Sequence, residues 1–117
     1  MRNFKELKIW QKGFEIALDT YKIVGTFPNS EKYSLAQQVS KSALSIPSNI
    51  AEGSSRSSRK DYIRFLEISL GSSFELETQL LIAKAVNFGN EELLLSTLSK
   101  IDEEQKMIMA FIKKLNN

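Results

Sequence analysis

Apolar residues recur along most of the chain at spacings of three and four, which is the period of an α-helix. The first such segment runs from about Leu7 to Gly25. One face of this segment carries Trp10, Phe14, Ala17, Tyr21 and Val24. Gly25 and the following Pro28 are typical of a helix end. The pattern therefore predicts a first helix over this stretch.

A second helix is predicted from Ser30, a good N-cap residue, to Gly53. Its apolar stripe consists of Leu35, Val39, Ala43, Ile46 and Ile50. Pro47 lies inside the stripe, and because proline lacks the backbone N–H and clashes with the preceding turn, we expect a kink between Ala43 and Pro47. Three serines can bond to the backbone groups that are freed, and these are Ser42, Ser45 and Ser48.

The serine-rich stretch 53–58 predicts the one clear loop in the middle of the chain. Ser58 is a plausible N-cap for a long third helix, from about Arg59 to Phe88, and Gly89 is its expected stop. Small residues cluster inside this helix at Ser69, Gly71, Ser72 and Ser73. Glycine in mid-helix costs stability, so we expect another helix to approach closely here. A ligand that approaches the backbone is the alternative.

Asn90 is the expected cap of a fourth helix, from Glu91 to about Leu115. Its apolar seam contains one polar member, Gln105, and consists of Leu94, Leu98, Ile101, Gln105, Ile108, Ile112 and Leu115. The acidic run Asp102-Glu103-Glu104 is expected on an exposed part of this helix. It is interpreted as a solvated face, with loose binding of a hard cation as the alternative.

Four helices joined by short turns, without any strand-like alternation, predict an all-α fold: an up-and-down antiparallel four-helix bundle formed by a single domain over residues 1–117. The third and fourth helices carry more apolar residues than one core-facing stripe requires. We therefore expect self-association. The alternative is that the third helix is simply well buried at the centre of a small bundle.

Composition excludes much chemistry. The 117 residues include no Cys and no His, which removes disulfides, thiolate nucleophiles, cysteine-bound zinc and the commonest acid–base group. The glycine-rich phosphate-binding motifs are also absent. We predict no catalytic residue, no cofactor and no metal, and an enzyme is the least favoured class. The apolar runs are too short for a membrane span, and a cytoplasmic, bacterial protein without membrane contact is expected.

The most informative charged feature is a basic cluster, although the net charge of the chain is only +2. Arg56, Arg59, Lys60 and Arg64 fall within nine residues and are opposed only by Asp61. Arg59 and Lys60 occupy the first turn of the third helix, where positive charge is unfavourable. Phosphate is the natural partner of such a cluster beside a helix N-terminus. The alternative is a solvated charged face.

The sequence has two further charged features. A second basic set is opposed by Glu6 and consists of Arg2, Lys5, Lys8 and Lys12. Glu52 opposes the dipole at the end of the second helix. We expect it to pair with Arg56 or Arg64, or else to be solvated.

Two longer strings resemble a known family. They are Ala-Leu-Ser-Ile-Pro-Ser-Asn-Ile-Ala-Glu-Gly at 43–53 and Phe-Leu-Glu-Ile-Ser-Leu-Gly-Ser-Ser-Phe-Glu at 65–75. Together with Trp10 and with Phe27-Pro28, they are similar to the four-helix-bundle family named after open reading frames in intervening sequences of 23S ribosomal RNA genes. The resemblance covers about Phe4 to Gly89, and the fourth helix matches in pattern only.

This resemblance implies four antiparallel helices assembled as a ring-like homopentamer. The family is similar to accessory proteins of diversity-generating retroelements, which form basic pentameric barrels and work with nucleic acid and a reverse transcriptase. This chain departs from the family pattern at two places. Lys41 stands alone where two basic residues are common, so the positive charge is weaker. Gly13 replaces an expected alanine.

We therefore expect a non-enzymatic, oligomeric protein that associates with RNA or DNA or serves as an adaptor to a nucleic-acid-processing protein. The candidate phosphate contacts are Lys41, Arg56, Arg59, Lys60 and Arg64. The alternative is a protein-interaction scaffold without any role in nucleic-acid binding.

Overall fold

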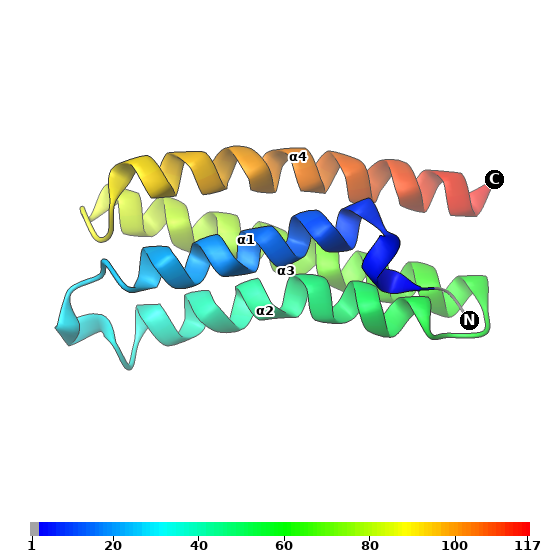
Figure 1. The fold of residues 1–117 in the computed structure, drawn as a ribbon, viewed down its shortest axis with the longest axis horizontal. Coiled ribbons are helices and arrows are strands. Elements are labelled where there is room, and N and C mark those ends of the chain that lie inside the picture. The colour runs from blue at the N-terminus through cyan, green and yellow to red at the C-terminus, as the bar shows by residue number, and fades with distance from the viewer. Residues whose placement is uncertain (1–2) are drawn as a thin grey trace.

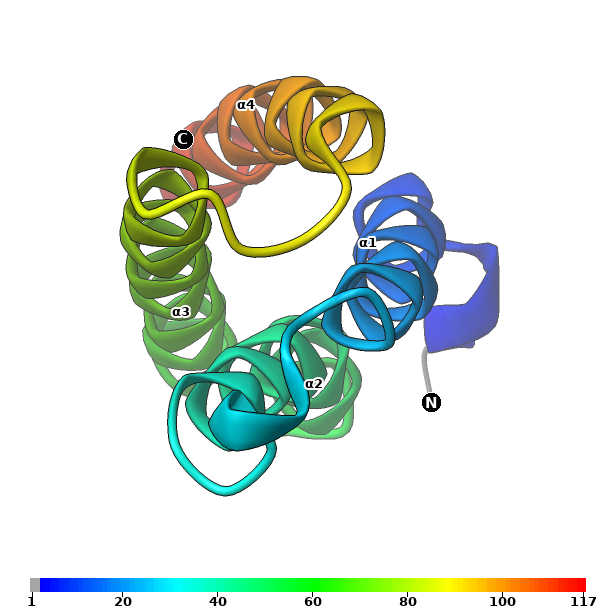
Figure 2. The same cartoon turned by 90° about the vertical axis from the view of Figure 1, so that its left-hand side faces the viewer.

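The computed structural model describes residues 3–117 and consists of four long antiparallel helices (Figure 1). These are α1 (Lys8–Val24), α2 (Leu35–Ser54), α3 (Arg59–Ala85) and α4 (Glu91–Asn116), with short 3₁₀ turns at Phe4–Glu6 and Asn29–Glu31. Figure 2 shows the helices in chain order around one shared core. The bundle measures 45 × 23 × 20 Å, and no strand occurs in the part of the chain that is described. The predicted all-α bundle is confirmed.

Two of the predicted helix ends are wrong. α2 begins at Leu35 rather than after Ser30, because Ser34 has a non-helical backbone (φ −125°, ψ −99°) and Asn29–Glu31 forms a separate 3₁₀ turn. α3 ends at Ala85 rather than at Phe88. Asn87 and Gly89 both take positive φ, 63° and 87°, and this left-handed backbone ends the helix.

The predicted caps at the other helix starts are confirmed. The Ser58 side chain accepts a hydrogen bond from the Asp61 backbone N–H at 3.0 Å. Asn90 does the same for the Leu93 N–H at 3.0 Å. Each cap satisfies one of the donors that a helix leaves open at its first turn.

The face of α1 that carries its large side chains is not the face that forms the core. The core-facing residues are Ile9, Gly13, Ile16, Ala17, Thr20 and Ile23. Trp10 stacks on Phe14 outside this stripe, with ring centroids 5.1 Å apart. Phe14 and Tyr21 remain 46% and 49% exposed. An aromatic strip on the surface of α1 is therefore left for other contacts.

Small residues join α2 to α3, as their clustering suggested. Ser69 donates a hydrogen bond to the Ile46 carbonyl at 2.8 Å, and the Ser45 and Ser72 hydroxyls lie 2.7 Å apart. Ser42 and Ser45 of α2 thus bond across to side chains of α3, and α2 continues through Pro47 without a break. Gly71 differs from its neighbours: apart from its adjacent residues and the backbone of its own helix, no atom of the described chain lies within 4 Å of a Cβ placed there.

The expectation that residues 102–104 are all exposed is wrong for Glu104, which is fully buried. Neither of its carboxyl oxygens has a hydrogen-bond partner among the described residues. Burial raises the pKa of Glu104 to about 8, and the positive charge of Lys12 opposes this rise. A Cβ on Gly13 would lie 2.6 Å from Glu104 Oε2. Gly13 therefore makes the space that this neutral acid occupies.

The burial of Glu104 has a sequence signal. It follows Ile101 by three positions and precedes Ile108 by four, so all three lie on one helix face. Both isoleucines are fully buried. The seam of α4 was predicted correctly at Gln105, which is 5% exposed and donates to Glu77 at 2.9 Å, but Glu104 belongs to the same face.

Candidate nucleic-acid interface

The antiparallel fold brings three segments that are distant in sequence to one end of the bundle, where α1 and α3 begin and α2 and α4 end (Figure 1). We call residues 3–12, 49–67 and 106–117 the basic end. These segments hold ten lysines and arginines against four acidic residues. Residues 13–48 and 68–105 hold five against ten. The small net charge therefore conceals a strong separation of charge along the molecule.

A surface hollow of about 540 Å³ lies at the basic end, between α3 and α4. Arg59, Lys60 and Arg64 line it together with Ile63, Glu67 and Asn116. Three of the five predicted contact residues are thus brought together. Arg59 and Lys60 belong to the first turn of α3, where the helix dipole adds to their positive charge. The hollow offers an anion three cationic side chains and one opposing carboxylate.

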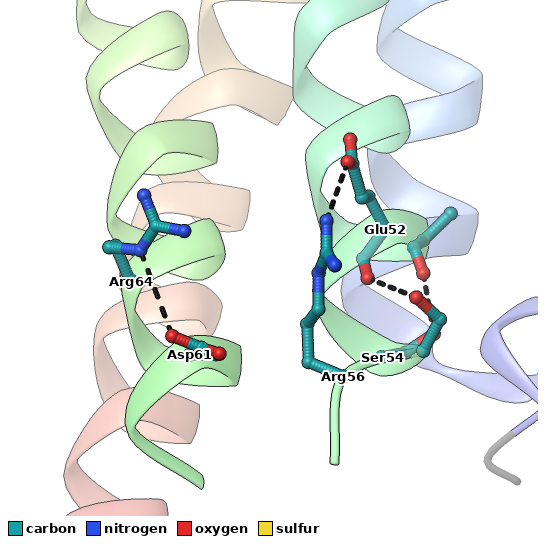
Figure 3. A network of polar contacts seen from close by, with 7 residues as sticks. Glu52, Ser54, Arg56, Asp61 and Arg64 are labelled. Atoms are coloured by element: carbon teal, nitrogen blue, oxygen red, sulfur yellow. Dashed lines mark hydrogen bonds and ion pairs between the residues drawn. The ribbon is translucent and has the colours of Figure 1, made fainter. Parts of the chain in front are cut away.

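Arg56, the fourth predicted residue, lies just beyond α2 at the same end (Figure 3). Its guanidinium donates to Glu52 Oε1 at 3.0 Å, so Glu52 is paired with Arg56. Arg64 instead lies 4.0 Å from Asp61 Oδ1. Both ion pairs are formed by exposed side chains, and such pairs are weak enough to be exchanged for a ligand.

Arg56 and Arg64 also meet at one aromatic ring. Their guanidinium carbons lie 4.7 Å and 5.0 Å from the centroid of Phe65. Phe65 is buried against α2, and Gly53 makes this possible because a Cβ there would lie 2.7 Å from the Phe65 Cβ. Arg56, Phe65 and Arg64 form what we call the Arg–Phe cluster. The helical spacing of the sequence does not indicate this cluster, although Gly53 and Phe65 both lie in the distinctive strings.

Lys41 is not part of this arrangement. It is exposed in the middle of α2, and at about 1.5 Å per residue it lies on the order of 20 Å from the end of that helix. Among the second basic set, Lys5 and Lys8 are exposed at the basic end, and Lys12 pairs with Glu103 at 3.3 Å. Arg2 lies outside the described residues.

Other kinds of site find little support. In residues 3–117 no group of three or more acidic, histidine or cysteine side chains is placed to hold a metal ion. No helix within that range is long and apolar enough to cross a membrane.

The Lys100 ammonium lies 2.6 Å from Asp19 and 2.8 Å from Glu15. These hydrogen bonds raise the pKa of Lys100 and lower the pKa of Glu15, and they join α1 to α4.

Comparison with known proteins points to one family. The family model described as 23S rRNA-intervening sequence protein matches residues 5–110. The fold is similar to a crystal structure of a protein with unknown function from the S23 ribosomal protein family of Bacteroides thetaiotaomicron. The two chains are 26% identical, with a TM-score of 0.82, and the match covers 90% of this chain and 95% of that one. No curated protein matches the sequence.

Proposed function

Because the chain belongs to the 23S rRNA-intervening sequence protein family, we propose that it is a non-enzymatic, oligomeric protein that binds the phosphate backbone of RNA or DNA. The observation that carries this proposal is the separation of charge, with ten cationic side chains against four acidic ones at the basic end. In this role the protein either binds a nucleic acid by itself or acts as an adaptor to a nucleic-acid-processing protein.

The electrostatics of the basic end favour an anionic partner. Like charges that gather at one end repel one another, and the dipole of α3 adds to the cost at Arg59 and Lys60. A phosphate in the hollow relieves both penalties. Arginine offers a planar fork of donors and lysine a point charge, and both suit phosphate oxygens. Lys41 is the least supported of the candidate contacts because it lies far from the hollow.

Self-association is the second part of the proposal, and two apolar surfaces support it. The first is the groove between α1 and α2. Four of its lining side chains are about half exposed, and these are Phe14, Leu18, Tyr21 and Leu44. The second consists of exposed apolar side chains of α3, its C-cap and α4, namely Phe74, Leu81, Ile82, Val86 and Leu95. Two different surfaces that meet head to tail close into a ring when the rotation permits. A ring-like homopentamer of this kind would bring five basic ends to one face.

Charge reversal tests the proposal. The Arg59→Glu, Lys60→Glu variant should lose at least an order of magnitude in affinity for a structured RNA and for duplex DNA of equal length, because each phosphate contact contributes to binding. Lys22→Glu with Lys84→Glu is the matched control, since both lysines are exposed and lie outside the basic end. Light scattering on the same samples gives the copy number.

The alternative is a protein-interaction scaffold, which the two apolar surfaces also favour. A scaffold would bind neither nucleic acid at low salt, and the two double variants would behave alike. That result would overturn the nucleic-acid proposal and leave the apolar surfaces as the functional ones.

A further inference from the structure

The Arg–Phe cluster differs from the other cations at the basic end because it places two guanidinium groups beside one aromatic ring. Their guanidinium carbons lie 4.7 Å and 5.0 Å from the centroid of the Phe65 ring, which is within the range of a cation–π interaction. Each is also held by a carboxylate of its own helix or loop, Glu52 for Arg56 and Asp61 for Arg64. Phe65 itself is 8% exposed and seated on Gly53. The ring and both arginine side chains therefore lie together in the absence of a ligand.

The two arginine side chains remain open to solvent, 42% exposed for Arg56 and 62% for Arg64. A guanidinium is planar and weakly hydrated, so it stacks on aromatic rings with one face and presents the other. Nucleobases stack readily on such planes and on aromatic side chains. Phosphate can also be bound by a lysine as a point charge, without an aromatic ring beside it, so phosphate binding alone does not account for Phe65 in this arrangement.

We propose that unpaired bases stack on Arg56 and Arg64, so that the basic end takes a single-stranded or loop segment of nucleic acid in preference to a duplex. The faces of paired bases are covered by their neighbours in a duplex and are not available for stacking. The hollow that adjoins Arg64 places Arg59 and Lys60 next to the cluster. These two cations would hold the phosphates of the strand whose bases lie on the arginines.

This inference rests on the proposed function, and the experiment separates the two. The probes are a short oligodeoxyadenylate, an abasic strand with the same number of phosphates, and a duplex of the same length. The wild-type protein should bind the base-bearing strand about tenfold or more tightly than the abasic strand, which is the usual size of base stacking on protein side chains. The duplex should bind more weakly than the base-bearing strand.

The decisive variant is Arg56→Lys with Arg64→Lys, which keeps both charges and removes both planes. It should bind the base-bearing strand no better than the abasic one, while its affinity for the abasic strand stays within about twofold of wild type. Arg59→Lys is the matched control, because Arg59 lies in the hollow but outside the Arg–Phe cluster, and it should keep the preference. Circular dichroism verifies that each variant is folded, and Phe65→Leu provides a second way to remove the cluster.

The outcomes are distinct. Equal affinity of the wild-type protein for both strands overturns the stacking inference and leaves phosphate binding intact. A preference that survives in both the double lysine variant and Phe65→Leu also overturns it. Failure of the wild-type protein to bind any of the three probes at low salt contradicts the proposed function itself, and the inference falls with it.

Discussion

The basic end and the middle of the bundle differ in where their ionisable side chains lie, exposed at the basic end and, for Glu104, buried in the middle. At the basic end, cationic side chains outnumber acidic ones by ten to four, and they remain exposed where a ligand can reach them. In the middle, a single carboxyl group, Glu104, is fully buried and has no hydrogen-bond partner among the described residues. Exposed side chains stay ionised and can attract charged partners. A buried carboxylate is unfavourable in free energy, so the carboxyl group keeps its proton instead.

This difference separates what serves function from what serves the fold. The repulsion at the basic end can be relieved by an anion from solution. Glu104 is fully buried, and because the nearby charge of Lys12 offsets only part of the cost of burial, a bound proton neutralises the carboxyl group near neutral pH. We therefore expect substitutions at the two regions to act on different properties, binding at the basic end and pH-dependent stability in the middle.

The largest expected effect on stability is the pH dependence that Glu104 causes. Its pKa is about 8 in the folded state against an ordinary value of 4.5. Below pH 4.5 both states hold the proton and Glu104 adds no pH dependence. Between pH 4.5 and 8 the unfolded chain releases the proton and the folded chain keeps it, so the free energy of unfolding falls as pH rises. The full difference corresponds to at most about 5 kcal/mol.

The Glu104→Gln variant should remove this dependence. Urea unfolding of wild type and variant at intervals from pH 5 to 9 measures it, and the variant should gain relative stability steadily toward alkaline pH. Asp102→Asn is the control, because Asp102 is exposed and pairs with Lys106 at 3.1 Å. Parallel stability curves for wild type and Glu104→Gln would show that the carboxyl group is ionised in the fold, contrary to this account.

The next effect concerns the space beside Glu104. Gly13→Ala should cost about 1–3 kcal/mol, because the new methyl group would lie 2.6 Å from Glu104 Oε2 and 3.2 Å from Ile46 Cγ2. If the carboxyl group is the main obstacle, the same substitution in a Glu104→Ala background should cost much less. Chemical denaturation of the four proteins in this cycle gives the coupling, and additive effects would indicate that the two residues do not share the space.

These two residues also show what the sequence could and could not predict. The caps at Ser58 and Asn90 and the seam of α4 were predictable because they depend on local spacing. The burial of Glu104 was not predicted because Asp102 and Glu103 beside it indicate an exposed acidic run, although Glu104 lies on the same helix face as Ile101 and Ile108. The Arg–Phe cluster depends on how the end of α2 packs on α3 through Gly53 and Phe65, which spacing within one helix does not reveal.

A smaller effect is expected at Gly71, on the exposed face of α3. Replacement by alanine should stabilise an isolated protomer by up to about 1 kcal/mol, since alanine is the better helix former and the described chain leaves the position open. If a second copy crosses α3 here, the same substitution should weaken self-association. Thermal unfolding and sedimentation of the variant distinguish these effects, and unchanged association would remove Gly71 from the proposed contact between copies.

The smallest expected effect is a gain in stability from the same substitutions that should weaken nucleic-acid binding. Arg59→Glu and Lys60→Glu place negative charge at the N-terminus of α3, where each should stabilise the fold by about 0.3–1 kcal/mol. The variant that loses nucleic-acid binding should therefore be slightly more stable than wild type. Denaturation at low salt tests this, and a clear loss of stability would show that the two cations support the fold instead of a ligand.

The most direct test of the central claim is the salt dependence of binding to a short structured RNA, measured for the wild-type protein and for Arg59→Glu, Lys60→Glu. If the basic end binds phosphates, the logarithm of the wild-type affinity should fall linearly with the logarithm of salt concentration, with a slope that reports several contacts. The variant should show a slope smaller by about two for each copy that contacts the RNA. Equal slopes for the two proteins, or no binding at low salt, would contradict the claim that this end of the bundle is a nucleic-acid interface.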